Sequence, residues 1–193
     1  MDGQQMPADI DIKTGTGFHI KGHKIITKYP IGVALMEAPF FALAATIDYR
    51  KGVEELKGYT TTHHKILSFS GAFYGTVGLL VFFLIGRRFW GLDATRAYLL
   101  TFMVLGCSNL LYYITRDPGM SHLYSFMIFA GLLHVFYASV QRKLVSQWKI
   151  ILLLFLLCMV VALRPLNLVF ISFPIAYLLF QFRKDLPKLT FVK

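Results

Sequence analysis

Long apolar stretches alternate along this chain with short, mostly basic connections, and that pattern predicts membrane-crossing helices. Three stretches contain no Asp, Glu, Lys or Arg: 66–85, 97–115 and 122–140. Because an α-helix rises about 1.5 Å per residue, about 20 apolar residues cross a hydrocarbon layer of about 30 Å. Basic residues flank each stretch. We therefore expect each of the three to form one transmembrane helix.

The last apolar tract, 150–182, contains a single charged residue, Arg164, which Pro165 follows. One helix over the whole tract would be about 50 Å long, more than one crossing requires. Proline interrupts a helix, and an arginine inside the membrane has to face protein or water. The tract predicts two short helices, 150–163 and 166–182, that turn at Arg164. One kinked and tilted helix is the alternative.

The amino-terminal part of the chain is more polar. Residues 1–29 have the composition of a loop, and 48–65 are polar and charged. Between them, 30–47 is apolar but is interrupted by Glu37 and Pro39. The pattern predicts a helix over 30–47 and leaves open whether that helix crosses the membrane.

The distribution of basic residues predicts an orientation, because short cytoplasmic loops are enriched in Lys and Arg. The segments 86–96, 141–149 and 183–193 together carry ten such residues. The opposite short connections carry two, Arg116 and Arg164. We expect the first set of connections in the cytoplasm, in a multi-pass protein of the cell membrane.

Composition agrees with this class. Of the 193 residues, 56% are hydrophobic and 16% charged, with a net charge of +10; soluble proteins have about 25% charged residues. Nucleic-acid binding would require a basic soluble domain, which the pattern does not predict. Cys107 and Cys158 lie within apolar segments without metal-ligand spacing, so we expect small apolar core residues. The histidines, such as His63 and His64, are too loosely spaced to predict a metal site.

Three groups of residues on the predicted external side are candidates for chemistry. Lys28 and Tyr29 precede Pro30 at the start of an apolar helix. The free N–H groups of a helix start attract anions, and a nearby lysine adds to that attraction. The alternative is an interfacial Lys-Tyr anchor with no ligand.

The other two groups are centred on arginines. Arg116 and His122 lie in a short connection dense in hydrogen-bonding groups; a guanidinium binds phosphate in a bidentate manner, and histidine can donate to it. An ordinary interfacial turn, with Asp117 paired to Arg116, explains the same composition. Arg164 is costly between two apolar helices and is therefore a functional candidate by default. The alternative is an arginine that snorkels to the interface.

The order and spacing of four segments resemble those of bacterial membrane glycosyltransferases of the GT-C fold, and the chain is similar to protein O-mannosyltransferases and aminoarabinose transferases. The resemblance covers most of the chain, from about Lys28 to about Phe182. The four segments are KYPIGVALMEAPFFALA, GRRFWG, YYITRDPGMSHLYSFMIFA and ALRPLNLVF.

This resemblance implies an all-α, polytopic transmembrane helical bundle of about five spans over 66–193. It also implies an external segment, 1–65, in which 30–47 is a juxtamembrane helix along the outer surface. The expected chain is a fragment that lacks the family's N-terminal span and its C-terminal part.

The implied reaction moves a sugar from a polyprenyl-phosphate donor to an acceptor glycan, lipid or protein on the outer face. In such enzymes an external carboxylate acts as general base, expected here upstream of the chain, and basic residues hold the lipid phosphate. By position, these would be Arg116, His122 and Arg164, and then Lys28 and Tyr29. The resemblance identifies no cofactor and leaves a divalent metal open. A transporter or flippase for lipid-linked sugars is the alternative, as is a non-catalytic membrane remnant.

Overall fold

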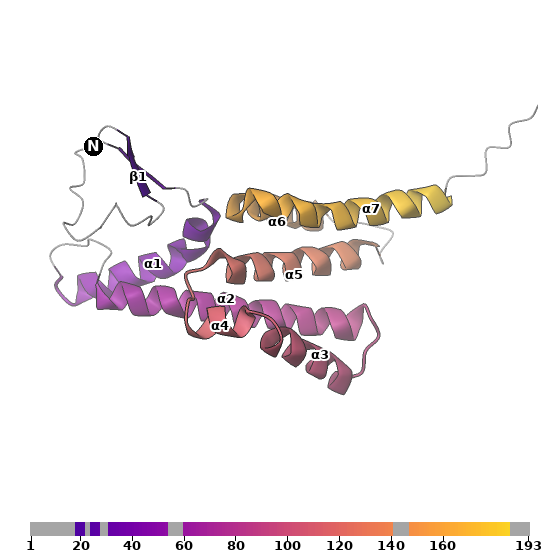
Figure 1. The fold of residues 1–193 in the computed structure, drawn as a ribbon, viewed down its shortest axis with the longest axis horizontal. Helices are drawn as coiled ribbons and strands as arrows, with labels where there is room; N and C mark the ends of the chain where they lie inside the picture. The colour runs from indigo at the N-terminus through magenta and orange to yellow at the C-terminus, as the bar shows by residue number, and fades with distance from the viewer. Residues whose placement is uncertain (1–17, 22–23, 28–30, 54–59, 141–146, 186–193) are drawn as a thin grey trace, which may run out of the picture.

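The computed structural model describes residues 18–21, 24–27, 31–53, 60–140 and 147–185 (Figure 1). Within these ranges the chain is all-α, with seven α-helices, apart from one small β-hairpin. Three helices are long and apolar enough to cross a membrane: α1 (Gly32–Arg50), α2 (Thr61–Arg88) and α5 (Ser121–Val140). They indicate a multi-pass membrane protein. The predicted stretches 66–85 and 122–140 lie inside α2 and α5.

The helices pack side by side in a bundle that contains both parallel and antiparallel neighbours. Helices α2 and α5 run in the same direction, since Gly71 packs on Pro118 and Phe89 stacks on Tyr137 at the other end. Helix α6 (Gln147–Leu163) returns along α5, and α7 (Leu168–Asp185) runs parallel to α5 again, as the Phe129–Phe170 ring contact shows. The main core lies between α1, α5 and α6 and contains Met36, Tyr124, Ile128, Leu132, Val135, Leu156, Met159, Val160 and Leu163.

The predicted single span over 97–115 is wrong. The structure has two helices there, α3 (Ala94–Gly106) and α4 (Leu110–Thr115), separated by an irregular segment. Ser108 accounts for the break: its hydroxyl donates to the Val104 carbonyl and accepts from the Leu110 N–H, so it replaces two backbone partners of a continuous helix. Both helices still return along α2.

The break predicted at Arg164 is confirmed. Arg164 is extended, with φ −159° and ψ 127°, and a short 3₁₀ turn, η2 (Pro165–Asn167), leads into α7. A residue before proline is pushed out of the helical region by the proline ring, which explains why α6 ends here. Because α6 and α7 run in opposite directions, the tract is a hairpin rather than one kinked helix.

Helix α1 pairs in an antiparallel manner with the first half of α2. Tyr74 donates to the Met36 carbonyl, and near the other end Asp48 contacts His63. In Figure 1, α1 lies beside the part of α2 that extends past the first turn of α5. Helix α1 is therefore displaced along the bundle axis from α5, α6 and α7. Because α1 runs along α2 rather than across it, this displacement does not by itself support a helix that lies flat on the membrane surface, and that location for 30–47 stays a prediction.

Two further expectations change with the structure. Residues 1–29, expected to be a loop, include an antiparallel hairpin of β1 (Phe18–Lys21) and β2 (Lys24–Thr27). Cys107 and Cys158 are exposed rather than buried in the core. Both lie on the outside of the bundle, where the helices have no neighbour within the described chain.

Candidate functional site

Polar side chains from several elements converge on the beginning of α5. We call Ser121, His122, Tyr124 and Ser125 the α5 polar turn. Helix α5 begins directly after a tight turn in which Met120 N–H donates to the Asp117 carbonyl, 3.2 Å away. Its first turn contacts α1, α2, α4 and the α6–α7 connection, each through a side chain.

Arg164 contacts the first two residues of the α5 polar turn. Its Nε donates to Ser121 Oγ at 2.6 Å, and its Nη2 lies 3.3 Å from His122 Nε2. An arginine donates only, so His122 Nε2 is the acceptor and its ring proton belongs on Nδ1. Tyr113 of α4 stacks on the His122 ring, with centroids 4.6 Å apart and planes 16° apart. The guanidinium is thus held in one place with Nη1 unbonded within the described residues.

Glu37 reaches the same turn from α1. The buried Tyr124 hydroxyl donates to Glu37 Oε1 at 2.7 Å and lies 3.1 Å from Ser70 Oγ. Glu37 also lines an open pocket of about 270 Å³ between α1 and α2. The rest of its lining is mostly apolar: Ala34, Ala38, Phe41 and Leu67. The site therefore holds a carboxylate with one fixed oxygen beside an open, largely apolar space.

Asn167 positions Ser125, the remaining residue of the α5 polar turn. Its buried Nδ2 donates to Ser125 Oγ at 3.1 Å and to the Val160 carbonyl at 3.3 Å. These bonds attach the α6–α7 connection to α5 immediately below Arg164. The position of the guanidinium is consequently set by buried contacts on both of its sides in the sequence.

The structure brings together some of the predicted residues. Arg164 and His122 are in contact, whereas Arg116 is exposed at the end of α4, and no side-chain hydrogen bond or ion pair of it is found within the described ranges. The pairing of Asp117 with Arg116, considered as part of the alternative explanation, is likewise absent from that part of the chain. Lys28 and Tyr29 lie outside the described residues.

Sequence reasoning missed Glu37 and Tyr124 as parts of the site. A carboxylate in an otherwise apolar helix was a signal for Glu37, but its partner lies 87 residues away in the sequence. Four polar residues within the first five positions of an apolar helix, 121–125, were the corresponding signal in α5. In the described residues, no three His, Cys, Asp or Glu side chains lie close enough to hold a metal ion.

Comparisons of this chain with protein families, with curated proteins and with solved structures found no match. Chemically, the site offers a fixed guanidinium, a neutral imidazole acceptor and a carboxylate around one helix turn. Such a set can bind a phosphate at the arginine and accept a hydrogen bond or a proton at the carboxylate.

Proposed function

We propose that the chain is part of an integral membrane glycosyltransferase that moves a sugar from a polyprenyl-phosphate donor to an acceptor on the outer face. The observation that carries this proposal is Arg164, held by Ser121 and His122 at a helix break. Arginine suits phosphate because its planar fork donates two parallel hydrogen bonds. A guanidinium that is already fixed needs little reorganisation as charge develops on the phosphate.

In the proposed reaction, the acceptor oxygen forms a bond to the anomeric carbon of the sugar. The bond from that carbon to the phosphate oxygen breaks, and its electron pair leaves with the lipid phosphate. Arg164 offsets the added negative charge. A carboxylate that acts as general base takes the acceptor proton. Glu37 has a different role here, because its bond from Tyr124 fixes α1 against the bundle.

The proposal includes an arrangement in the membrane. The carboxyl ends of α2, α5 and α7 lie at one end of the bundle, and the α5 polar turn and Arg164 lie towards the other (Figure 1). The first end carries the basic connections and is placed in the cytoplasm. The polar turn then faces the outer surface, where the lipid-linked donor is used, and α1 extends outward from it beside the amino end of α2.

Lipid-phosphate binding by the Arg164→Ala variant tests the proposal. Native mass spectrometry of the detergent-purified chain with undecaprenyl phosphate should show binding weakened about 10- to 100-fold, since a charge-assisted hydrogen-bond pair is lost. Arg96→Ala is the matched control: Arg96 is exposed at the opposite end and pairs only with the exposed Asp93. Wild-type affinity in Arg164→Ala, or equal losses in both variants, would contradict the assignment.

A transporter or flippase for lipid-linked sugars is the second candidate, and the break between α3 and α4 favours it. The helix over this stretch is interrupted after Gly106, and transporters bind substrates at interrupted helices. A fluorescent lipid-linked sugar in proteoliposomes distinguishes the two. Movement of the intact lipid across the bilayer supports the transporter, and sugar release on one face supports the transferase.

A further inference from the structure

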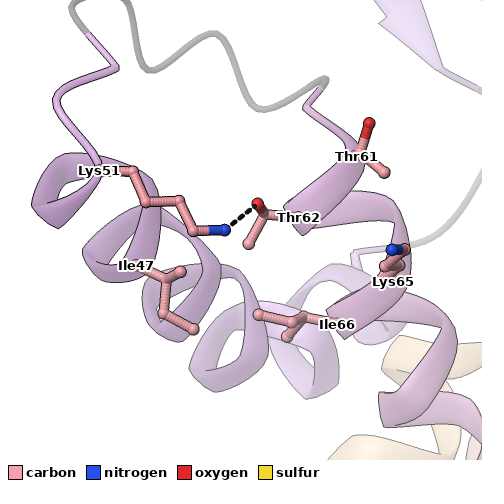
Figure 2. A pocket seen from close by; sticks show the side chains of 6 residues that line it. All are labelled: Ile47, Lys51, Thr61, Thr62, Lys65 and Ile66. Carbon is pink, nitrogen blue, oxygen red and sulfur yellow. Dashed lines mark hydrogen bonds between the residues drawn. The ribbon is translucent and has the colours of Figure 1, made fainter.

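A second polar pocket lies between the carboxyl end of α1 and the amino end of α2, away from the α5 polar turn. Figure 2 shows its six lining residues around a space of about 320 Å³. We call it the α1–α2 pocket. It has a polar rim and an apolar floor, and the lining residues are Lys51, Thr61, Thr62 and Lys65 on the rim and Ile47 and Ile66 on the floor.

Among the described residues that line the pocket, two are positively charged and none is negatively charged. Lys51 and Lys65 both line the pocket, and Lys51 Nζ points to Thr62 Oγ1, 3.4 Å away (Figure 2). Neither lysine forms an ion pair within the described residues. Two ammonium groups beside one pocket repel each other, and a bound anion relieves that repulsion.

A nearby carboxylate does not neutralise these lysines. Asp48 lies one helical turn before Lys51; its Oδ2 accepts from the Thr60 hydroxyl and lies 3.0 Å from His63 Nδ1, and the Thr62 hydroxyl also bonds to its carboxylate. Asp48 and His63 are each only 1% exposed. The Asp48 carboxylate is thus engaged by Thr60, Thr62 and His63 rather than by the lysines, and Asp48 is not among the lining residues.

The pocket lies at the depth of lipid headgroups if α5 spans the hydrocarbon. Helix α5 has 20 residues, about 30 Å. Its first turn is level with Ser70 of α2, as the contact between Tyr124 and Ser70 shows. Thr62 precedes Ser70 by eight residues, about 12 Å, and Ser121 precedes Tyr124 by three residues, about 4.5 Å, so the rim lies about 7–8 Å beyond the first residue of α5. The headgroup layer adds several ångströms on each side of the hydrocarbon, with water beyond it.

We propose that the α1–α2 pocket binds the phosphate of an anionic membrane-lipid headgroup. Lys51 and Lys65 supply the charge and the N–H donors, and Thr62 accepts from Lys51 and so helps to position its ammonium group. Ile47 and Ile66 contact the apolar part of the same molecule below the phosphate. This apolar floor favours an amphiphile over free phosphate, because bound free phosphate would leave the floor exposed to water. The site is separate from Arg164 and does not depend on the proposed transferase activity.

Lipid binding by lysine variants tests the site. Native mass spectrometry of the delipidated chain with phosphatidylglycerol should show affinity about fivefold weaker in Lys51→Gln and in Lys65→Gln, and about 30-fold weaker in the double variant. Phosphatidylcholine, which has no net charge, should bind weakly to all of them. Arg50→Gln is the matched control, because Arg50 is an exposed neighbour of Lys51 that does not line the pocket.

Two additional measurements keep the test decisive. Thr62→Val keeps both lysines and the side-chain shape, and should still weaken phosphatidylglycerol binding about two- to fivefold, because Lys51 loses the acceptor that positions it. Inorganic phosphate, added alone, should bind no better to the wild type than to the double variant. Equal losses in Arg50→Gln and the lysine variants would show diffuse surface charge and overturn the site. Lysine-dependent binding of inorganic phosphate as tight as that of the lipid would overturn the lipid assignment.

Discussion

Tyr124 connects three helices through one hydroxyl group. It belongs to α5, donates to Glu37 of α1 and lies beside Ser70 of α2. Its ring is fully buried and contacts the ring of Tyr74, 5.5 Å away between centroids. Removing the hydroxyl leaves the ring packing in place. It also deprives the half-buried Glu37 carboxylate of its hydrogen-bond donor, and this loss is the main source of the expected destabilisation.

Tyr124→Phe should therefore destabilise the chain by about 1–2 kcal/mol, towards the low end because hydrogen bonds in membrane proteins are modest. The measurement is reversible unfolding in detergent followed by circular dichroism. Tyr98→Phe is the control, since Tyr98 is 66% exposed on α3 and its loss should change stability by less than about 0.5 kcal/mol. Equal stability of Tyr124→Phe and wild type would mean that the Glu37 bond is not formed in solution.

The residues of the site differ in how far the sequence could predict them. Arg164 was predictable, because one charge in a long apolar tract is costly and demands an explanation. Its contacts with Ser121 and His122 were not, since they depend on where the α6–α7 turn lands on α5. The partnership of Glu37 with Tyr124 has the same origin in tertiary packing.

At the scale of elements, close approach of α1 to α6 depends on one glycine. A methyl group at Gly32 would overlap the backbone of Ala162 and Leu163, where neither neighbour can rotate away. This contact seats the start of α1 on the end of α6, directly beside Arg164. Backbone atoms form the α6 side of this interface, and a glycine without a side chain forms the α1 side. No side chain can therefore move to make room for an added methyl group.

Gly32→Ala should consequently cost about 1–3 kcal/mol and separate the start of α1 from α6. Thermal unfolding in detergent measures the cost, and cross-linking between cysteines placed at Val33 and Val161 reports the separation. Gly106→Ala provides the contrast, because a methyl group there meets no atom within 4 Å and should leave stability unchanged or slightly higher. A Gly32→Ala variant as stable as Gly106→Ala would be incompatible with this packing.

The helix boundaries show why some elements were predictable. The stop at Arg164 follows from proline chemistry, which acts on the immediately preceding residue and needs no tertiary information. The stop at Gly106 follows from a Ser108 hydroxyl that competes with the backbone, and serine also occurs inside continuous helices. Hydrophobicity alone therefore predicted a span over 97–115 that the structure divides in two.

At the scale of the whole molecule, the order of the helices sorts the connections to two ends. The α2–α3 connection lies at the end where α5 and α7 finish, and the turn before α5 lies towards the end where α6 stops. The distribution of basic residues in the sequence predicted which connections lie at the same end. Lys and Arg are enriched in the connections on one side of a membrane protein, and this enrichment can be recognised even where a helix boundary is placed wrongly.

Thiol labelling checks the proposed orientation. In a background with Cys107→Ala and Cys158→Ala, needed because both native thiols are exposed, a cysteine at Gly119 should react with an impermeant maleimide in intact cells. One at Thr95 should react only after lysis. Thr95 is preferable to Gly91, whose φ of 66° disfavours a side chain. Labelling of Thr95→Cys from outside, with Gly119→Cys protected, would reverse the topology.

Helix α2 is longer than the bundle around it, and this has a consequence for the kind of membrane the protein suits. Its 28 residues rise about 42 Å, so it crosses a hydrocarbon layer of about 30 Å and extends about 12 Å beyond it together with the carboxyl end of α1. Bilayers differ in thickness by a few ångströms. Because α1 is attached to α2 through buried contacts, a thicker bilayer brings the α1–α2 pocket deeper among the headgroups and a thinner one lifts it towards water. Bilayer thickness is therefore expected to tune which lipids the pocket can reach.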